Sequence, residues 1–344
     1  MDTHKTHQNG MSLVELMVAM AISVTLLGGL VEVYLGSKQS YNLAEESSRL
    51  QENGRFAMDI LTREIRGSDF WGCLRKPDNQ VLYNNLDQGS AAYDPAQHEF
   101  GEAVTGVDGG GSNPDSISFG GAYGKGISVT QQMVQSSAVI HVNDGNGLDQ
   151  GDIIILSDCS SGDIFQVSNA NPGGTGTVVH NSGAVTSPGN VSDPGITGCN
   201  GANAHCLSKV YGTDAQVYEM RRIGYDIRAG ASGANGLFRT EGGRSDEVIE
   251  NVENMQILYG EDTDGDRFHT PNQYVNATDI GANIGNAISV RIALLLKGER
   301  DIMPQNTAQA HRLLDATVNT NDRRLYRIFT TTITIRNRAL IDSL

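Results

Sequence analysis

Residues 11–35 decide the fold, and they read MSLVELMVAMAISVTLLGGLVEVYL. As a helix, the part from Leu13 to Leu35 would rise about 1.5 Å per residue, roughly 34 Å in all, which is enough to span a bilayer. A short polar leader precedes this stretch and ends in Gly10. A carboxylate, Glu15, lies shortly beyond that glycine, inside the apolar run. A charge in such a segment costs free energy, so its presence indicates a function and a partner.

Two ordinary interpretations explain less of this stretch. A conventional signal peptide needs a small-x-small cleavage site after the apolar run, and Gly28-Gly29 lies too deep in the run to serve as one. A simple single-pass anchor leaves Gly10 and Glu15 without a role. The pattern instead resembles the class III signal of type IV pilins and type II secretion pseudopilins. In those proteins the leader is cut after the glycine, and the apolar segment is kept.

The resemblance to a class III signal implies roles for three residues. A membrane prepilin peptidase would cleave after Gly10 and methylate the new amine of Met11. The resulting ammonium would lie four residues from Glu15, about 6 Å along the helix. In a filament of packed helices, Glu15 would pair with the Met11 ammonium of a neighbouring subunit.

Composition indicates an exported, β-rich domain behind this helix. The chain has 344 residues, a formal net charge of −15, 41 glycines and only 6% aromatic residues. A glycine-rich, aromatic-poor sequence is typical of a loop-rich β domain rather than a compact α/β enzyme. The acidic balance argues against a nucleic-acid partner, because nucleic-acid binding requires a basic surface.

Four cysteines, all beyond the apolar stretch, predict two disulfides. They are Cys73, Cys159, Cys199 and Cys206, and three pairings are possible. A Cys199–Cys206 bond would close a short loop, and Cys73–Cys159 would then tie the end of the helix to the β domain. A zinc site is the alternative, with His205 adjacent, but the spacing contains no C-x-x-C pair and disfavours it.

The helix is expected to continue from Ser12 to about Arg66, roughly 80 Å in all. Residues 37–66 contain no proline, and apolar residues recur mostly at steps of three or four. Gly54 is expected to weaken the helix, since glycine in an exposed helix interior costs about 1 kcal/mol relative to alanine. These patterns divide the chain into a leader (1–10), an apolar half-helix (11–35), an amphipathic half-helix (36–66) and a β-rich head (67–344).

The head is expected to be mostly antiparallel β-sheet, which makes the fold class α+β. Alternation of apolar residues is clearest in 288–296 and 329–335. Further strands are expected at 115–119, 127–134, 138–142, 152–157, 163–167 and 252–259, with a strand pair within 211–227. A helical turn is expected at 308–314, and irregular structure is expected at 74–114, 169–206 and 230–243.

Several short motifs resemble those of one family. They are QENGRFAMDILTREIR (51–66), FWGC (70–73), DIIILSDC (152–159), DTDGD (262–266) and FTTTITIRNR (329–338). In this order, behind a class III signal, they resemble the PilW-type minor pilins of type IV pili. More distantly, they resemble the J-type minor pseudopilins of type II secretion.

This resemblance implies a long N-terminal helix on a pilin-like head, and a role in association rather than catalysis. The protein would sit in the inner membrane of a Gram-negative bacterium, with its head in the periplasm. It would join other minor pilins and the major pilin in the complex that primes pilus assembly. The alternatives are a type II secretion minor pseudopilin, and an adhesin or calcium-dependent binding module that uses residues 169–206 and an acidic loop.

That acidic loop is the best candidate for a metal site. Asp262, Asp264 and Asp266 alternate within one turn, and carboxylates in this arrangement suit calcium. The turn is not an EF-hand, because Arg267 stands where such a loop needs glycine. A solvated turn without a cofactor is the alternative.

No motif indicates catalysis, so an anchored enzyme is the least supported alternative. The eight histidines are scattered without an H-E-x-x-H pattern, and the chain has no G-x-S-x-G. The glycine-rich run 120–125 lacks the spacing and the βαβ context of a phosphate loop. Trp71 is expected to pack under the helix end. The basic spots at 323–324 and 336–338 are either strand-edge charges or a docking contact.

Overall fold

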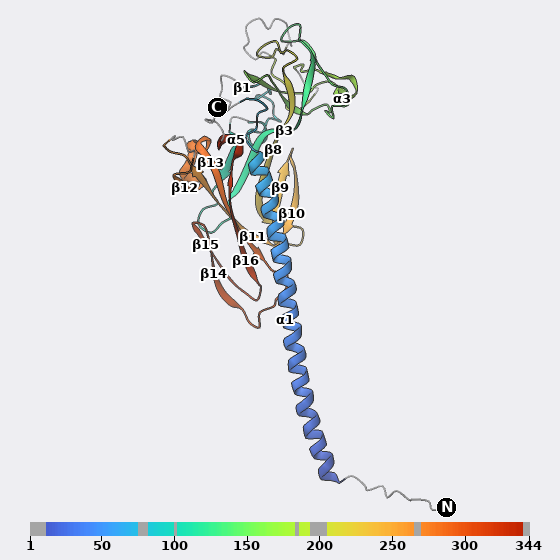
Figure 1. The fold of residues 1–344 in the computed structure, drawn as a ribbon, viewed down its shortest axis with the longest axis vertical. Helices are drawn as coiled ribbons and strands as arrows, with labels where there is room; N and C mark the ends of the chain where they lie inside the picture. Colours follow the sequence, from blue (N-terminus) through green and yellow to red (C-terminus); the bar gives the residue numbers. More distant parts are fainter. Residues whose placement is uncertain are drawn as a thin grey trace, which may run out of the picture.

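A computed structural model describes residues 12–74, 82–99, 102–182, 186–192, 205–264 and 270–339 of the protein. Within them, one long helix carries a β-rich head, and the helix projects far beyond that head (Figure 1). The sheets of the head are mostly antiparallel. The architecture is therefore the α+β, pilin-like fold that the sequence predicts.

Helix α1 runs unbroken over Leu13–Gly67, as the absence of proline and the apolar periodicity predict. Ser12 caps its N-terminus, and the backbone N–H of Ser68 donates to the carbonyl of Glu64 at its C-terminus. The two halves of the helix differ in burial. Residues 12–41 are all exposed, whereas the buried residues of α1 fall between positions 46 and 65.

The docked half of α1 packs on a four-stranded antiparallel sheet with strand order β12-β11-β13-β16. Alternate residues of β13, such as Val290 and Ile292, join the core beneath α1. The hairpin of β14 and β15 covers the opposite face, where Leu313 meets Leu295. The strands are β11 (Val252–Glu261), β12 (Gln273–Val275), β13 (Ala287–Lys297), β14 (Thr307–Leu313), β15 (Ala316–Asp322) and β16 (Tyr326–Thr334).

A ten-stranded sheet forms most of the rest of the head, and its β1–β6 pair is parallel. Its strands are β1 (Leu82–Asn84), β2 (Val104–Val107), β3 (Ser116–Gln131), β4 (Ile140–Val142), β5 (Ile153–Ser157), β6 (Gly162–Gln166), β7 (Thr177–Val178), β8 (Gln216–Ala229), β9 (Asn235–Glu241) and β10 (Arg244–Glu250). Short helical turns are α2 (Pro95–His98), α3 (Pro172–Thr175), α4 (Ala277–Ile280), η1 (Gly281–Asn286) and α5 (Arg336–Ala339).

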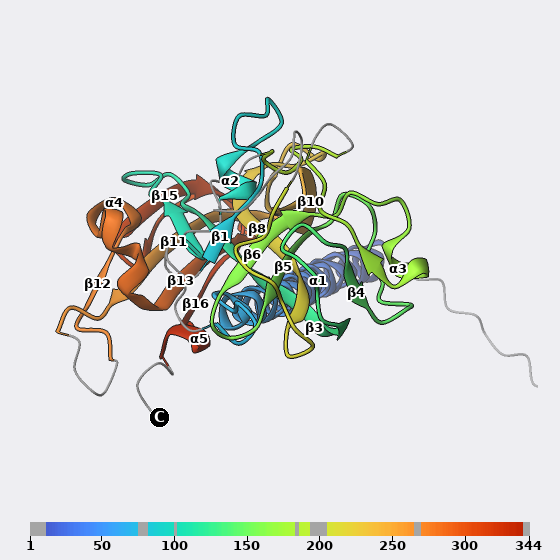
Figure 2. The same ribbon diagram turned by 90° about the horizontal axis from the view of Figure 1, so that it is seen from above.

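The head has two lobes, and two long paired strands, β3 and β8, run through both of them (Figures 1 and 2). The part of the head whose core lies under α1 is called the proximal lobe, and Ile117 of β3 belongs to that core. Val129 near the other end of β3 lies in a separate core, built with β4 to β7, which we call the distal lobe. A register shift between Tyr123 and Ile127 interrupts the β3–β8 pairing between the two cores.

Three predictions for the head are wrong. The expected strand pair within 211–227 is one strand, β8, which spans both lobes. The expected helical turn at 308–314 is β14, because pairing with β15 and burial of Leu313 override the helical preference of its alanines. The expected loop at 230–243 contains β9, and Gly242-Gly243, both at positive φ, form the tight turn to β10.

Other boundaries also differ from the prediction. The expected strands at 115–119 and 127–134 belong to the same strand, β3. The stretch 74–114, expected to be irregular, holds β1, α2 and β2, and the stretch 169–206 holds α3 and β7. These elements are two to four residues long, too short for a periodic pattern to reveal them.

Candidate assembly site

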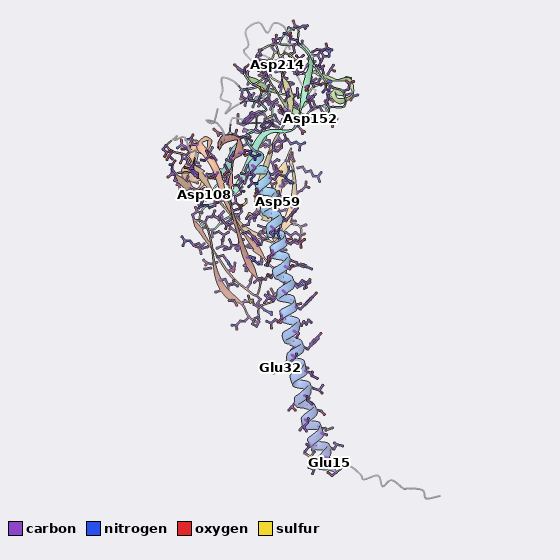
Figure 3. The ribbon with its side chains drawn as sticks, viewed as in Figure 1. Glu15, Glu32, Asp59, Asp108, Asp152 and Asp214 are labelled. Atoms are coloured by element: carbon purple, nitrogen blue, oxygen red, sulfur yellow. A yellow bond between two sulfur atoms is a disulfide. The ribbon has the colours of Figure 1, made fainter. Side chains whose placement is uncertain are left out.

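The N-terminus of α1 is closed by a reciprocal cap between Ser12 and Glu15. The Ser12 hydroxyl accepts from the Glu15 backbone N–H at 3.2 Å, and Glu15 Oε2 accepts from the Ser12 N–H at 2.9 Å. This capping box satisfies two backbone donors and keeps the carboxylate at the positive end of the helix dipole. Figure 3 shows Glu15 at the far tip of the projecting helix. Gly10 and Met11 lie outside the described residues.

The apolar half of α1 satisfies its own hydroxyl groups. Ser23 Oγ donates to the Ala19 carbonyl at 2.7 Å, and Thr25 Oγ1 donates to the Ile22 carbonyl at 2.8 Å. These bonds satisfy the hydroxyl hydrogens of both Ser23 and Thr25 within the helix, as a segment in lipid requires. Among the described residues, α1 is the helix long and apolar enough to cross a membrane.

A second carboxylate, Glu32, lies near the other end of the apolar run and was not singled out from the sequence. Figure 3 places Glu32 on the projecting helix, well away from the head. It lies seventeen positions after Glu15, about 25 Å at the helical rise. The two carboxylates thus bracket a length close to that of a hydrocarbon core, about 30 Å.

Gly54 allows a close approach between α1 and the sheet. Sequence reasoning placed Gly54 in an exposed helix interior, but it is buried against Phe329 of β16. A Cβ on residue 54 would lie 2.3 Å from the Phe329 ring, which no real Cβ contact allows. The glycine that weakens the helix locally is therefore needed for docking.

An ion-pair clamp fixes the helix where it leaves the head. Arg300 Nη1 lies 2.7 Å from Glu45 Oε2, and Arg49 Nη1 lies 2.9 Å from Glu299 Oε2. The hydrogen bond from Arg300 lowers the pKa of Glu45. The buried Glu46 accepts from the Glu299 backbone N–H at 2.9 Å. Residues 298–300, which follow β13, thus contact α1 through both side chains and backbone.

The other end of α1 is held by Asp69, which follows the helix. Asp69 Oδ1 accepts from Trp71 Nε1 at 2.6 Å, and its Oδ2 lies 2.5 Å from Arg338 Nε. Trp71 is buried, as predicted. Arg338 also donates to the carbonyls of Ile284 and Ala287. Arg338 therefore forms buried hydrogen bonds inside the head, and it is neither a strand-edge charge nor a docking contact.

A disulfide joins the end of α1 to the distal lobe. Cys73 and Cys159 are bonded, with Cα atoms 4.6 Å apart, across 86 residues of sequence. Cys206 is also disulfide-bonded, and Cys199 lies outside the described residues. All described cysteines are oxidised, so the structure contains no thiolate available for zinc.

A buried carboxylate organises the segment around Cys206. Asp163 of β6 is fully buried and accepts four kinds of donor within 3.1 Å: the Ser208 N–H and hydroxyl, the Tyr211 hydroxyl and the Asn85 amide. Burial raises the pKa of Asp163, against the effect of these donors. Its hydrogen-bonding capacity is consumed internally.

Two histidines meet in the distal core. His180 Nε2 lies 3.0 Å from the Ala138 carbonyl, which can only accept, so this nitrogen carries a proton. A neutral His180 then accepts at Nδ1 from His205 Nδ1, 2.8 Å away. His205 Nε2 is left as a buried lone pair without a hydrogen-bond donor among the described residues. Burial lowers the pKa of His205 to about 3 and also lowers that of His180.

The acidic loop is only partly described, because Asp266 lies outside the described residues. Asp264 Oδ2 accepts from Asn272 Nδ2 at 2.8 Å, and Asn272 Oδ1 accepts from the Thr263 N–H at 2.7 Å. In the described part of the chain, no three His, Cys, Asp or Glu side chains come close enough to hold a metal ion. Calcium binding by Asp262, Asp264 and Asp266 therefore stays a prediction.

The projecting apolar helix, the capped carboxylate at its tip and the docked amphipathic half define a pilin-type protein. Two family models match this interpretation. The prokaryotic N-terminal methylation motif matches residues 5–31, and type IV pilus-assembly protein W matches residues 224–337. Together the two matches support a PilW-type minor pilin of a type IV pilus. Such a protein is processed as a prepilin, anchored in a membrane and assembled with other pilins.

Among solved structures, a type IV-like pilin from Thermus thermophilus resembles the chain at 12% sequence identity and a TM-score of 0.36. The resemblance covers 85% of this chain and 98% of that one, and it is too loose to support an argument. No curated protein matches the chain significantly. Proteins of this family and fold are structural and usually non-enzymatic.

Proposed function

We propose that this minor pilin acts in the complex that primes type IV pilus assembly, together with other minor pilins and the major pilin. Residues 13–35 hold it in the inner membrane of a Gram-negative bacterium, with the head in the periplasm. The observation that supports this best is the unequal burial of α1. Its docked half is covered by the head, whereas its apolar half has no cover within the described chain and needs lipid or neighbouring helices.

Processing prepares the tip of the helix for assembly. A prepilin peptidase cleaves after Gly10, where the small residue lets the enzyme approach the backbone closely, and methylates Met11. Ser12 and Glu15 remain in the mature protein, so the capping box survives cleavage. The mature helix therefore keeps its ordered start.

The capped carboxylate supplies the assembly contact. Within the described residues, Glu15 has no cation as partner, and in lipid a carboxylate costs up to about 3 kcal/mol. The ammonium of Met11 on a neighbouring subunit offsets this cost. Association of helices is therefore favoured over the isolated subunit in the membrane.

We also propose that the protein has no catalytic activity. The buried titratable groups of the distal lobe are engaged in internal bonds: Asp163 with neutral donors, and His180 with His205. Association through helices and heads is the whole of its mechanism.

Two measurements test the proposed function: the N-terminus of the mature protein, and the phenotype of a strain that lacks the gene. Mass spectrometry should find a mature N-terminus at N-methyl-Met11, and deletion of the gene should remove surface pili. An intact Met1, or a mature N-terminus beyond Leu35, would end the pilin proposal. A secretion defect with normal pili would instead identify a type II secretion pseudopilin.

A pair of variants separates the charge of Glu15 from its cap. Glu15→Gln keeps a side chain that completes a capping box, whereas Glu15→Ala removes both cap and charge. Both should be processed and inserted normally. Both should lose surface pili about tenfold or more, since a lost pair of about 2 kcal/mol exceeds a tenfold change in association. Full piliation with Glu15→Gln would refute the charge-pair role.

A further inference from the structure

A crevice of about 250 Å³ lies between α1 and the head, close to where the helix emerges; we call it the basal crevice. Three segments of the chain form its walls: one stretch of α1, the turn between β10 and β11, and the end of β13. Its lining residues are Glu46, Arg49, Leu50, Glu52, Asn53, Glu250, Asn251, Lys297, Gly298 and Glu299.

The backbone at the rim is specifically shaped. Asn251 adopts a left-handed conformation with φ 59°, which makes the β10–β11 turn tight, and its carbonyl accepts from the Lys297 N–H at 2.9 Å. A Cβ on Gly298 would lie 3.1 Å from Glu46 Oε2, so glycine leaves room for that carboxylate. The crevice is therefore held open by ordered backbone.

The cations that line the basal crevice are already engaged. Lys297 Nζ lies 3.6 Å from carboxylate oxygens of both Glu253 and Asp322. Arg49 is shared between Glu45 and Glu299, at 3.2 Å and 2.9 Å. Neither side chain is available to neutralise the other acidic groups of the crevice.

Two kinds of carboxylate line the crevice. Glu52 and Glu250 are exposed to solvent, and neither forms an ion pair with a described residue. Glu46 is 1% exposed, and no described donor reaches its Oε1 by a hydrogen bond. The nearest cation to that atom is Arg300 Nε, at 3.7 Å. A buried carboxylate oxygen without a hydrogen-bond donor costs free energy, so a further cation near Glu46 Oε1 would be stabilising.

The shape of the crevice selects the kind of cation. Among the described residues no three acidic, His or Cys side chains are close enough to chelate a metal ion. The carboxylates instead line a space of about 250 Å³ that Leu50 also lines with apolar surface. A long side chain with an apolar stem and a multi-donor cationic head fits such a space, and the guanidinium of arginine offers five donors.

We propose that the basal crevice receives a basic side chain, by preference an arginine, from the helix of a neighbouring pilin. The proposal rests on the function proposed above. Glu46 lies eleven residues beyond Leu35, about 16 Å past the apolar span. A helix packed along the projecting half of α1 continues past the crevice, because α1 itself forms one of its walls. The crevice then fixes the axial register between neighbours.

The first test reverses the charge of the crevice in the full-length protein in cells. Glu52→Arg with Glu250→Arg places two cations of the chain's own at the mouth, and surface pili should fall about tenfold or more. The matched control is Asp246→Arg with Asp214→Arg, which changes net charge equally outside the crevice and should keep pili. Full piliation with the crevice pair, or an equal loss with the control pair, would overturn the proposal.

A second measurement identifies the occupant. A benzophenone side chain at Asn53 should crosslink, in cells, to a pilin helix peptide that contains arginine or lysine. A crosslink confined to lipid, or to a pilin segment without a basic residue, would contradict the inference. Failure of the crevice proposal can be told apart from failure of the proposed function. If gene deletion removes pili but the crevice variant keeps normal pili, only the crevice proposal is refuted.

Discussion

The two lobes of the head are stabilised in different ways. In the proximal lobe, apolar residues of α1, such as Leu61 and Ile65, pack on a large core shared with Leu294 and Ile333. In the distal lobe, a smaller core is supplemented by disulfides, the Asp163 network and the histidine pair. The PilW family model covers 224–337, which includes most strands of the proximal lobe and excludes most of the distal lobe.

The difference shows what a pilin helix contributes. Where α1 is available, its apolar face adds burial to the core of the lobe, at roughly 25 cal/mol per Å². Where it is absent, covalent links and buried polar groups stabilise a small core. Changes in the distal lobe should therefore act through cross-links and protonation, and changes in the proximal lobe should act through packing.

The largest expected effect comes from the disulfide that joins the end of α1 to the distal lobe. Replacing Cys73 and Cys159 with serine should lower the free energy of unfolding by about 4 kcal/mol, because the bond closes a loop of 86 residues. Replacing Cys199 and Cys206 should cost about 2 kcal/mol, since that predicted loop is short. Urea unfolding of the full-length protein in detergent measures both. Recovery of Cys73 or Cys159 as an alkylatable thiol in native protein would refute this scheme.

Acidification should loosen the distal lobe selectively. The pKa of His205 is lowered to about 3 in the fold, so between pH 3 and 6.5 the unfolded chain binds more protons than the folded one. The contribution of His205 to stability is full above pH 6.5 and falls as pH drops, by about 3 kcal/mol at pH 4, and the raised pKa of Asp163 offsets part of this loss. Hydrogen exchange in 205–211 should report the loss. His205→Gln should flatten it, and an unchanged exchange rate at pH 4 would contradict the pairing.

The proximal lobe should respond to acid in the opposite direction. Burial raises the pKa of Asp115 to about 6, although it accepts from the Gly109 and Ile257 N–H groups. Between pH 4 and 6 the folded state binds this proton more readily, so protonation of Asp115 adds stability as pH falls. Loss of exchange protection in β11 before residues 205–211 would contradict the contrast between the lobes.

Packing under α1 is tested by a pair of glycines. Gly54→Ala should destabilise the proximal lobe by about 2 kcal/mol, because overpacking against Phe329 outweighs the gain in helix propensity of about 1 kcal/mol. Gly67→Ala is the control, since a Cβ there meets nothing within 4 Å. Thermal melting should separate the two variants. A stabilising Gly54→Ala would show that the helix is not docked so closely.

The smallest expected effect concerns the acidic loop. If Asp262, Asp264 and Asp266 share a calcium ion, tenfold excess over Kd should add about 1.4 kcal/mol, and magnesium should add less. Asp264→Asn, which keeps the shape and removes one charge, should abolish the gain. An unchanged melting temperature of chelator-treated protein in millimolar calcium would leave a plain solvated turn.

The sequence alone determined the elements whose signals are local. Continuous periodicity without proline predicts α1, and strict alternation predicts β13 and β16. The resemblance of 11–35 to a class III signal, together with the short motifs that follow it, predicted a PilW-type minor pilin. These secondary-structure predictions succeed because a helix of 55 residues, or a half-buried strand, repeats its apolar pattern often enough for the period to be recognised.

Only the tertiary structure decided how distant segments meet. It made β8 one strand across two lobes, turned 308–314 into a hairpin and placed Gly54 against a ring 275 residues away (329 minus 54). It also brought His180 to His205 and left Glu46 buried at the basal crevice. No local pattern encodes these contacts, because each depends on groups far apart in sequence whose burial and pairing are fixed together when the core forms.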